Sequence, residues 1–490
     1  MNFGVVYLAN LSHYVPELLA IVTMMGLLFL EATYGDDEKG RHYVFWSAIA
    51  GIFSTAVFLV LQLGNKPVMI FTNAVVIDPF STLAKLIMTL GTLGCFIIAK
   101  TSSDIYEKLK SEFYIMTTGV LVGGMLLSSA NNLLIIYLGI ETLSILSYVL
   151  AALKKDDDRS SEAGLKYVLY GGLSAGVMLY GISHVYGVLG TIQFNEIIPM
   201  MKGLNTEQIV ILMPSFLLFF VGLGYKIACV PFHMWTPDVY EGSPIPVTAF
   251  FSIVPKVAAI ACLIRVTLTF FSDPGVLQYS WVGLLSVVSA LTMTVGNVSA
   301  IGQKSVKRML AYSSISHAGM MLLGVIVIDE VGIRAILYYA IAYLFMTLVA
   351  FFVTSFVANK YGNDHFERFN GLIKRYPVMA IMMSITLFSL AGLPPFSGFV
   401  AKFNILAAII AKKHYTLAVI AALNSVVSLF YYMKLSRLMI LKEPDSTESI
   451  QSFSFVGQSV IVALAIPIVI LGIFWGSIMS IAQKSMIFIQ

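Results

Sequence analysis

Charged residues are scarce in this sequence. Only 11% of its 490 residues are Asp, Glu, Lys or Arg, whereas 58% are hydrophobic. A typical soluble domain has about 25% charged and about 45–50% apolar residues. The composition therefore excludes a soluble protein of this size and predicts a chain that lies mostly inside a membrane. The small net charge of +4 gives no reason to expect a nucleic acid partner.

Cysteine is almost absent. The three that occur, Cys95, Cys229 and Cys262, lie in apolar stretches at no metal-binding spacing, and we interpret them as packing residues. The sequence also lacks a CxxC motif, a dinucleotide-binding fingerprint and a phosphate-binding loop. We therefore expect no cofactor, no metal ion and no redox centre in this chain. The first residues lack the basic segment of a signal peptide, so we expect no cleaved signal.

Long apolar runs dominate instead. A helix needs about 20 apolar residues to span a bilayer, and about fourteen segments meet that need. The runs are continuous rather than alternating, which argues against a β-barrel. We predict an all-α polytopic membrane protein with no separate soluble domain. The predicted helices are 14–34, 42–62, 78–99, 112–130, 131–152, 163–188, 209–231, 247–271, 280–300, 312–328, 333–357, 377–411, 416–437 and 455–483.

The Lys and Arg residues indicate how these helices are oriented. Of the 30, 18 fall in or beside the odd-numbered connections, and six fall in the even-numbered connections and tails. Because cytoplasmic loops carry the excess of positive charge, the odd-numbered connections should be cytoplasmic and both termini should face outward. The connection 232–246 departs from this pattern, since it has no Lys or Arg. Residues 192–208 should form an outer loop with a short amphipathic piece.

Two of the predicted helices are interrupted by proline. The seventh has Pro231 in GLGYKIACVPFHMWTPD, and the twelfth has Pro394 and Pro395 in SLAGLPPFSGFVAKF. Freed backbone groups are tolerated at membrane depth only inside protein or beside water. A pair of such breaks is typical of transporters built from repeats. Helices 4–8 and 9–13 are five each, and an odd number of helices forces the second set to be inverted.

This repeat would put Lys226 of the seventh helix and Lys402 of the twelfth in matching places. It also divides the chain into four parts. They are residues 1–111 with three transmembrane helices, 112–271 with the first five-helix repeat, 280–437 with the inverted repeat, and 438–490 with the last transmembrane helix.

Four charged residues, Glu141, Lys226, Lys256 and Lys402, lie within otherwise apolar helices. A charge at mid-bilayer costs about 2.5–3.5 kcal/mol on insertion scales. Lys and Glu are also groups whose protonation responds readily to burial and pairing. A line of such groups is what a proton path needs, so we predict that all four take part in proton translocation. The alternative is a static role, in which ion pairs and backbone carbonyls hold helices together.

Three further residues are secondary candidates for a proton path. Glu162 and Lys166 are four residues apart, hence on one face of the sixth helix near its cytoplasmic end. Lys166 could instead extend to the membrane surface. His317 could relay protons, because histidine titrates near neutral pH, but a hydrogen-bonded packing role is equally consistent.

Other polar or small residues are better explained as structural. Lys85 shares a helix face with Asp78 close to the outer surface, and Arg265 is also near that surface. We expect local pairing or extension toward water for both cations. Gly172 and Gly176 form a GxxxG motif, which predicts a close helix contact.

The stretch GLGYKIACVPFHMWTPDVYEGSPIPVTAFFSIVPKVA (222–258) closely resembles the antiporter-like subunit N of proton-pumping NADH:quinone oxidoreductase, respiratory complex I. Within that family group, proline before lysine in the eighth helix, here Pro255 and Lys256, separates subunit N from subunits L and M. Lys402 differs from the glutamate that subunit M carries in its twelfth helix. Supporting stretches are LGIETLSILSYVL (138–150), EAGLKYVLYGG (162–172), QKSVKRMLAYSSISHAGMM (303–321) and LAGLPPFSGFVAKF (390–403).

The resemblance implies a role for each buried charge. Glu141 and Lys226 match a charged pair between the fifth and seventh helices, Lys256 would link two half-channels, and Lys402 would release protons to the outside. It also implies a subunit of a translocase that carries no redox centre itself. FMN, iron–sulfur clusters and quinone would lie in partner subunits.

The implied setting is the bacterial inner membrane, with a multi-pass chain whose termini are both periplasmic. The implied partners are an M-like neighbour, K-, J- and A-like subunits, and lipids. A subunit of a multisubunit cation/proton antiporter is the alternative, because it shares the charged pair and broken helices; the Pro255–Lys256 pair disfavours it. A non-pumping scaffold is a third possibility, which the buried charges disfavour because apolar residues would be more stabilising there.

Overall fold

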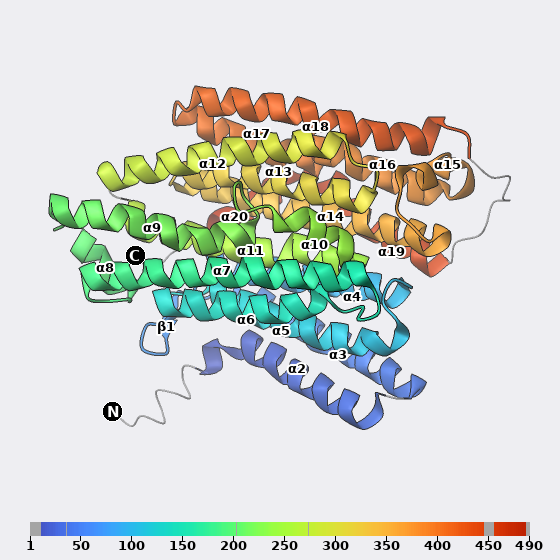
Figure 1. The fold of residues 1–490 in the computed structure, drawn as a ribbon, viewed down its shortest axis with the longest axis horizontal. Helices are drawn as coiled ribbons and strands as arrows, with labels where there is room; N and C mark the ends of the chain where they lie inside the picture. Colours follow the sequence, from blue (N-terminus) through green and yellow to red (C-terminus); the bar gives the residue numbers. More distant parts are fainter. Residues whose placement is uncertain (1–10, 36, 202, 273, 445–454, 487–490) are drawn as a thin grey trace.

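The computed structural model describes residues 11–35, 37–201, 203–272, 274–444 and 455–486, and this part of the chain is almost entirely helical. The helices lie side by side in one elongated bundle (Figure 1). The prediction of an all-α polytopic membrane protein is confirmed. The expected absence of a signal peptide concerns residues 1–10, which lie outside the described residues.

Thirteen of the described helices are long and apolar enough to cross a membrane. Together with one broken helix, they account for the fourteen predicted segments. The long helices are α2 (Val15–Tyr34), α3 (Glu38–Gln62), α4 (Pro79–Thr101), α5 (Lys110–Ser128), α6 (Leu133–Ala151), α7 (Asp158–Leu189), α9 (Thr206–Ile227), α11 (Ile245–Phe271), α12 (Val276–Ile301), α13 (Val306–Ile326), α14 (Glu330–Tyr361), α18 (Tyr415–Leu441) and α19 (Phe455–Ile473).

The shorter elements lie between these helices or follow them. One pair forms an antiparallel hairpin in which Met69 faces Val76. The elements are β1 (Val68–Ile70), β2 (Val75–Ile77), η1 (Glu107–Leu109), α8 (Phe194–Met201), α10 (Trp235–Gly242), η2 (Phe366–Phe369), α15 (Leu372–Arg375), α16 (Pro377–Ala391), α17 (Ser397–Ala411) and α20 (Trp475–Lys484).

The connections gather at the two ends of the bundle. We call the end with β1, β2 and α8 the hairpin end; it is on the left of Figure 1. We call the opposite end, with connections 102–109, 152–157, 302–305 and 362–376, the basic end. The expected short helix within 192–208 is confirmed as α8.

One predicted loop is wrong. Residues 232–246 were expected to be a connection, but α10 occupies most of this stretch. Its residues Trp235, Val239 and Tyr240 are buried, so an apolar face stabilises this eight-residue helix against the bundle. The loop lacks Lys and Arg because much of it is a helix inside the protein.

Both predicted helix interruptions are present. Helix α9 ends at Ile227 and is followed by Ala228 in the left-handed region, at φ 64°. Helix α16 ends at Ala391 and is followed by Gly392 at φ 90°, a conformation that glycine adopts without steric cost. The chain then resumes as α10 and α17. A Cβ atom on Gly398 would lie 1.8 Å from the Ser389 carbonyl oxygen, so only glycine allows α17 to pack this close to α16.

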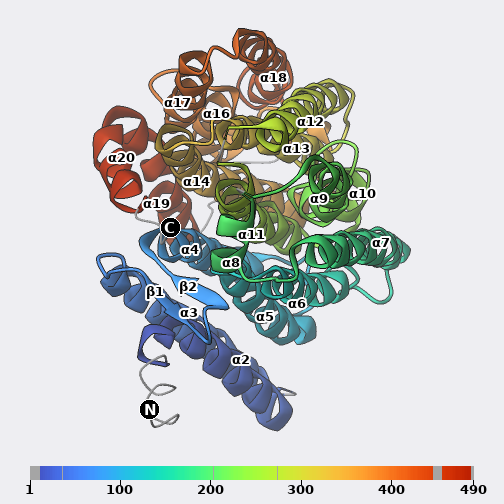
Figure 2. The same ribbon diagram turned by 90° about the vertical axis from the view of Figure 1, so that its left-hand side faces the viewer.

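Helices α11, α13 and α14 form the interior of the bundle. The end-on view in Figure 2 shows them surrounded by the other helices, and most of their residues are buried. The peripheral helices instead expose large apolar side chains, such as Phe29, Leu61, Leu173 and Val426. Such a surface suits lipid or other membrane subunits rather than water.

The predicted close contact at the GxxxG motif is wrong. Gly172 and Gly176 are exposed, and a Cβ atom on either would have no neighbour within 4 Å among the described residues. The motif faces away from the bundle, so no helix of the described chain packs on it.

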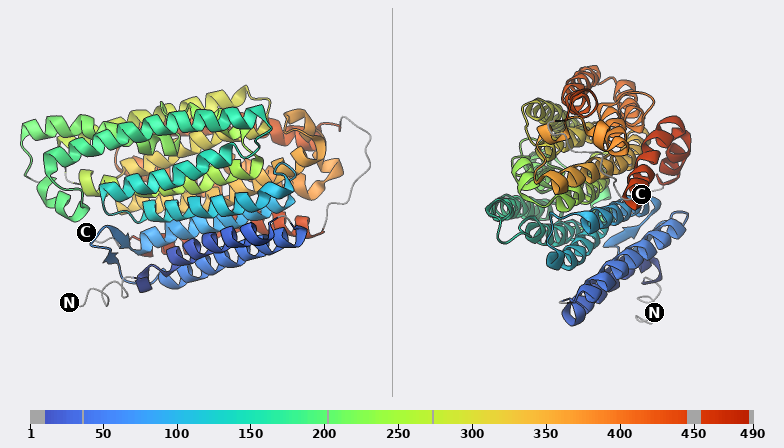
Figure 3. Two further views of the ribbon diagram at one scale, coloured as in Figure 1. Left: turned by 60° about the horizontal axis from the view of Figure 1, so that its bottom comes forward. Right: turned by 90° about the vertical axis from the view of Figure 1, so that its right-hand side faces the viewer.

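The N-terminal layer of α2 and α3 runs along one side of the bundle (Figure 3). A buried ion pair joins it to α4, because the Lys85 ammonium contacts the Glu17 carboxylate. Lys85 is fully buried, so it does not extend toward water. Asp78 pairs instead with Arg265 of α11, at 2.9 Å. Local pairing was therefore predicted correctly for both cations, but Glu17 was not predicted as the partner of Lys85.

Candidate functional site

An aromatic cage surrounds Lys226 in the last turn of α9. The residue is 1% exposed, and its ammonium donates a hydrogen bond to the Tyr167 hydroxyl at 3.3 Å. The ammonium also lies 5.0, 5.5 and 5.7 Å from the ring centres of Tyr167, Tyr225 and Tyr148. Trp235 of α10 stacks on Tyr167 with 4.4 Å between ring centres. Aromatic faces attract a cation without fixing it as firmly as a carboxylate would.

Glu141 lies on α6 and is half-buried. Within the described part of the chain no carboxylate, including that of Glu141, lies within 4.0 Å of the Lys226 ammonium. The predicted pair is therefore not a contact pair. The two charges still interact through space, because Coulomb forces extend well beyond contact distance in a medium of low dielectric constant.

Lys256 projects from α11 into a set of hydroxyl groups. Its ammonium donates to the Ser314 carbonyl oxygen at 2.9 Å and to the Ser314 hydroxyl at 2.5 Å, both on α13. The Ser314 hydroxyl also accepts a hydrogen bond from Tyr343 of α14 at 2.9 Å. Both acceptors are on α13, so the hydrogen bonds of Lys256 join α11 to α13.

His317 lies on the same helix as Ser314 and continues the polar row. Its Nδ1 is 2.6 Å from the Tyr339 hydroxyl and its Nε2 is 3.2 Å from the Tyr432 hydroxyl, so both ring nitrogens have a hydrogen-bonding neighbour. Its ring centre lies 5.2 Å from that of Tyr343. Which nitrogen donates depends on the tautomer. The arrangement places His317 between the hydroxyl groups around Lys256 and those near α18.

Lys402 binds at the second helix break. Its ammonium donates to the carbonyl oxygen of Ala391, the last residue of α16, at 2.9 Å. The carbonyl end of a helix carries partial negative charge and favours a cation. Lys402 and His317 both line a small polar cavity of about 10 Å³, with Asn297, Asn424 and Tyr431. That volume suits a single water molecule, which could bridge the two side chains.

Lys226 and Lys402 lie on different sides of their breaks. Lys226 belongs to the helix before its break, whereas Lys402 belongs to α17, after its break. Both ammonium groups nevertheless sit beside the ends of the half-helices. The two lysines therefore lie beside corresponding breaks, as expected from the sequence, but they do not occupy corresponding positions relative to those breaks.

Glu162 and Lys166 belong to a separate charged cluster at the basic end. Lys166 contacts Glu162 at 2.6 Å and Asp238 of α10 at 2.7 Å. Arg308 pairs with Asp238 at 3.2 Å and with Glu241. These residues line an open cavity of about 240 Å³. Lys166 is thus a partly exposed, ion-paired residue. It adjoins the cage through α7, on which Tyr167 follows it, and through α10, which carries both Asp238 and Trp235.

The partners of the buried lysines were not found from the sequence. Tyr167, Ser314, Tyr339, Tyr343 and Tyr432 were not among the residues predicted to form a proton path. A signal did exist, because Ser314 and His317 are three apart and Tyr339 and Tyr343 four apart, so each pair shares a helix face. Whether the pair on α13 faces the pair on α14 depends on how these two helices pack.

The His, Cys, Asp and Glu side chains of the described residues are not clustered as metal ligands. These residues contain no group of three or more His, Cys, Asp and Glu side chains arranged to hold a metal ion. The three cysteines are buried and unpaired with one another. The chemistry that this row of lysines, tyrosines, serine and histidine can perform is the acceptance and transfer of protons.

Comparisons with known proteins agree with this geometry. The family described as NADH:quinone oxidoreductase/Mrp antiporter matches residues 130–428. NADH-quinone oxidoreductase subunit N 2 of Sorangium cellulosum is 40% identical, with 97% of each chain covered. Subunit N of Moorella thermoacetica is 36% identical, with 98% of each covered.

Solved structures give the same result. A chain of respiratory complex I from Thermus thermophilus with bound aureothin has a TM-score of 0.80 at 29% identity, and the match covers 96% of this chain and 99% of that one. A chain of the Mrp complex from Dietzia sp. has a TM-score of 0.82 at 20% identity, with 96% of each chain covered. The second likeness shows the fold alone.

Proposed function

The chain belongs to the NADH:quinone oxidoreductase/Mrp antiporter family and groups there with the subunit N proteins, and from this premise we propose that it is a proton-translocating membrane subunit of an NADH:quinone oxidoreductase. The observation that carries the proposal is the full-length similarity to subunit N together with an intact row of buried lysines. Partner subunits would transfer electrons from NADH to quinone, and this chain would move protons outward.

The aromatic cage is where we propose that the signal from electron transfer acts. The Lys226 ammonium has neutral partners, so its charge depends on more distant groups, of which Glu141 is the nearest candidate. A change of charge or position at Glu141 alters the energy of the ammonium, because the two interact through a medium of low dielectric constant. A proton released from Lys226 would then pass toward Lys256.

The inner part of the path runs from Lys256 to Lys402. The Ser314 hydroxyl joins Lys256 to Tyr343, and His317 lies beside Tyr343 with hydroxyl groups at both ring nitrogens. A water in the 10 Å³ cavity would connect His317 to Lys402. Lys402 is on α17, which runs toward the hairpin end, so we propose release at that end.

We propose that α5–α11 and α12–α18 are the two inverted repeats, in line with the division at 112–271 and 280–437. Two features support this. Each set contains one helix that is broken near its middle by a left-handed residue, Ala228 in one and Gly392 in the other. Each break has a lysine ammonium beside it, from Lys226 or Lys402.

Partners must supply the redox chemistry. FMN, iron–sulfur clusters and the quinone site would belong to other subunits. An M-like antiporter subunit and K-, J- and A-like subunits would adjoin the apolar outer faces, with lipid covering the rest. The basic end would face the cytoplasm of a bacterium and the hairpin end, with both termini, the periplasm, because the connections at the basic end carry most of the Lys and Arg.

Purification of this chain from its native membrane in mild detergent tests the proposal. Co-purifying, inhibitor-sensitive NADH:quinone reductase activity, with flavin and iron–sulfur absorption, is expected. A colourless, inactive eluate that exchanges cations for protons in liposomes would contradict it and would identify an antiporter subunit instead.

A further inference from the structure

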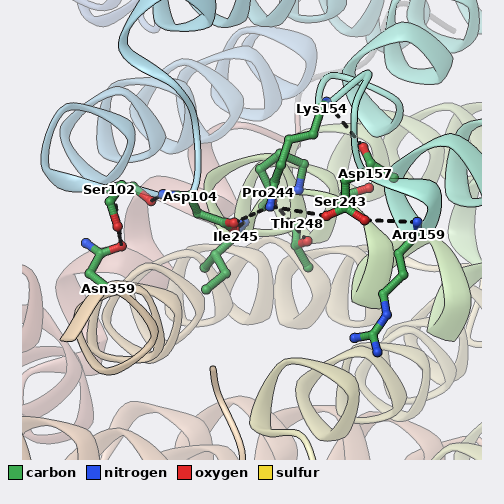
Figure 4. Close-up of polar contacts among 12 residues, drawn as sticks. Ser102, Asp104, Lys154, Asp157, Arg159, Ser243, Pro244, Ile245, Thr248 and Asn359 are labelled. Carbon is green, nitrogen blue, oxygen red and sulfur yellow. Dashed lines mark hydrogen bonds and ion pairs between the residues drawn. The ribbon is translucent and has the colours of Figure 1, made fainter. Parts of the chain in front are cut away.

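The most deeply buried helix of the bundle has no N-terminal cap of its own. Helix α11 starts at Ile245, and Pro244 before it offers no side-chain hydrogen bond. The first N–H groups of a helix need acceptors from elsewhere. The Ile245 N–H donates to the Asp104 carboxylate oxygen Oδ2 at 2.7 Å, from a residue 141 positions earlier in the sequence (Figure 4). A negative charge is also favourable at this end of the helix dipole.

The other oxygen of Asp104 is used as well. Oδ1 accepts a hydrogen bond from the Lys154 ammonium at 2.5 Å, in the connection between α6 and α7. Lys307 adds a second positive charge close by, and its ammonium donates to the Ser243 carbonyl oxygen at 3.0 Å, where α10 ends. Burial by itself raises the pKa of Asp104, but the charges of Lys307 and Lys154 and both hydrogen bonds outweigh it and hold the pKa below its usual range.

The loop that carries Asp104 is itself fixed. The Asp104 N–H donates to the Ser102 hydroxyl at 3.2 Å, and the Ser103 N–H donates to the Asn359 side chain at 3.0 Å. Asn359 returns a hydrogen bond to the Thr101 carbonyl oxygen at 3.0 Å. Asn359 belongs to α14, the helix that also carries Tyr339 and Tyr343. The carboxylate is therefore presented from a rigid support rather than from a free loop.

Asp104 thus joins the ends of the elements that carry the candidate site. The Lys154 connection follows α6 with Glu141 and Tyr148, and it precedes α7 with Tyr167. Ile245 begins α11, which carries Lys256 eleven residues further on, about 16 Å along the helix. A shift of this junction would be passed along the helices, since packed helices move as rigid units.

We propose that Asp104 is a positioning residue for proton translocation, which sets the position of α11, and so of Lys256, against the helices that form the Lys226 cage. This inference rests on the proposed function, because it assigns Asp104 a role through Lys256. Asp104 itself touches neither ammonium group of the path.

The test compares Asp104→Ala with Asp104→Asn in the intact complex in vesicles. Alanine removes the cap of α11, whereas asparagine keeps an acceptor for the Ile245 N–H and loses only the charge. Asp104→Ala should speed hydrogen exchange of the Ile245, Val247 and Thr248 amides at least tenfold and lower proton pumping per assembled complex at least threefold, with the KM for quinone unchanged. Asp104→Asn should restore the slow exchange and part of the pumping.

Asp157→Asn is the matched control. It makes the same chemical change 3.7 Å from the Lys154 ammonium but does not touch α11. It should pump normally. If Asp104→Ala prevents assembly, Lys154→Gln replaces it, because it removes one contact of Asp104 and leaves the cap in place; it should lower pumping per assembled complex.

Two outcomes would overturn the inference. One is normal pumping by assembled Asp104→Ala or, where that variant does not assemble, by Lys154→Gln. The other is a loss of pumping by assembled Asp104→Ala without faster exchange of the Ile245, Val247 and Thr248 amides. A Lys256→Met variant measured in parallel separates this from the proposed function. Full pumping by Lys256→Met would contradict the proposed function. Impaired pumping by Lys256→Met beside normal Asp104 variants would contradict only the role of Asp104.

Discussion

At the scale of single residues, the buried cations fall into two groups according to their partners. Lys85 and Arg265 face carboxylates, Glu17 and Asp78. Lys226, Lys256 and Lys402 face hydroxyl groups or backbone carbonyls. A lysine paired with a carboxylate cannot give up its proton without leaving an unpaired buried charge. A lysine with neutral partners has no such restriction, so the second group is the one suited to transfer.

Lys226→Ala should lower both proton pumping and the coupled reduction of quinone at least tenfold in fully assembled complex. The reason is that the cage then loses the ammonium, which is the group proposed to release the proton. A loss of about 1.5–3 kcal/mol, typical of one hydrogen bond to a charge, already corresponds to roughly tenfold or more. Lys155→Ala, an exposed lysine, should be normal. Full pumping by assembled Lys226→Ala would remove this residue from the path.

The effect of Asp104→Asn should not vary between about pH 5 and pH 9. The pKa of Asp104 is lowered in the folded protein. Its ionised form therefore contributes stability that is fully present above the unfolded value of about 3.9 and is lost only as the pH falls through the lower folded value. The ratio of mutant to wild-type pumping, measured across this range, should be flat. A ratio that rises toward 1 at pH 5 would mean that Asp104 protonates in the working range.

The sequence predicted which cations belong to the proposed path but not what they touch. Lysine and glutamate inside an apolar helix are visible in any sequence because they are rare there. Ser314, Tyr167 and the Ala391 carbonyl are not, because serine and tyrosine are common along the helices and backbone carbonyls are present in every helix. Their role depends on which helices face one another, and residues 256 and 314 come from helices that are brought together only by folding.

At the scale of secondary-structure elements, proline indicated where the two helices break but not which structure follows each break. Pro231 was taken as the end of the seventh helix, yet the chain forms α10 four residues later. Eight residues are too few to give a clear helical period, and burial against α7 and α13, rather than intrinsic preference, stabilises α10. The break at Pro394 and Pro395 was simpler, since long apolar runs lie on both sides.

Gly398→Ala should weaken the packing of α17 on α16. The new methyl group would overlap the Ser389 carbonyl oxygen, which is backbone and cannot rotate away. Overpacking of this kind costs about 1–3 kcal/mol, and it should displace Lys402 from Ala391. Thermal denaturation and pumping of the purified complex measure both effects. Gly172→Ala, in open space on α7, should leave stability equal or higher by up to about 1 kcal/mol; equal effects of the two changes would contradict the packing argument.

Lys85→Met should destabilise the attachment of α2 by about 3–5 kcal/mol, because it leaves the Glu17 carboxylate buried without its partner. The double variant Glu17→Leu with Lys85→Met should recover most of the loss. The denaturation temperature of the complex measures both the loss in the single variant and the recovery in the double variant. If the single variant is as stable as the wild type, the pair is not a structural link between α2 and α4.

At the scale of the whole molecule, the two ends of the bundle differ in charge, and this predicts opposite exposure. Lys155→Cys at the basic end should react with a membrane-impermeant thiol reagent only in inside-out vesicles, and Lys66→Cys at the hairpin end only in whole cells with a permeable outer envelope. Both positions are exposed, and the three native cysteines are buried, so background labelling should be low. The reverse pattern would invert the proposed orientation.

The depth of the polar row has a consequence for the electrical work of pumping. Lys256 is the twelfth residue of α11 and His317 the twelfth of α13, and both helices start at the basic end, so both side chains leave their helices about 16 Å in. Lys402 shares a one-water cavity with His317. A proton that passes from Lys256 to Lys402 therefore moves in the plane of the membrane. The work of moving one proton against the transmembrane voltage depends only on its change in depth. It is about 2.3 kcal/mol for a full crossing at 100 mV. In the proposed pump this work is therefore done while the proton enters as far as Lys256 and while it leaves from Lys402. The rate of the lateral step from Lys256 to Lys402 should not depend on the voltage.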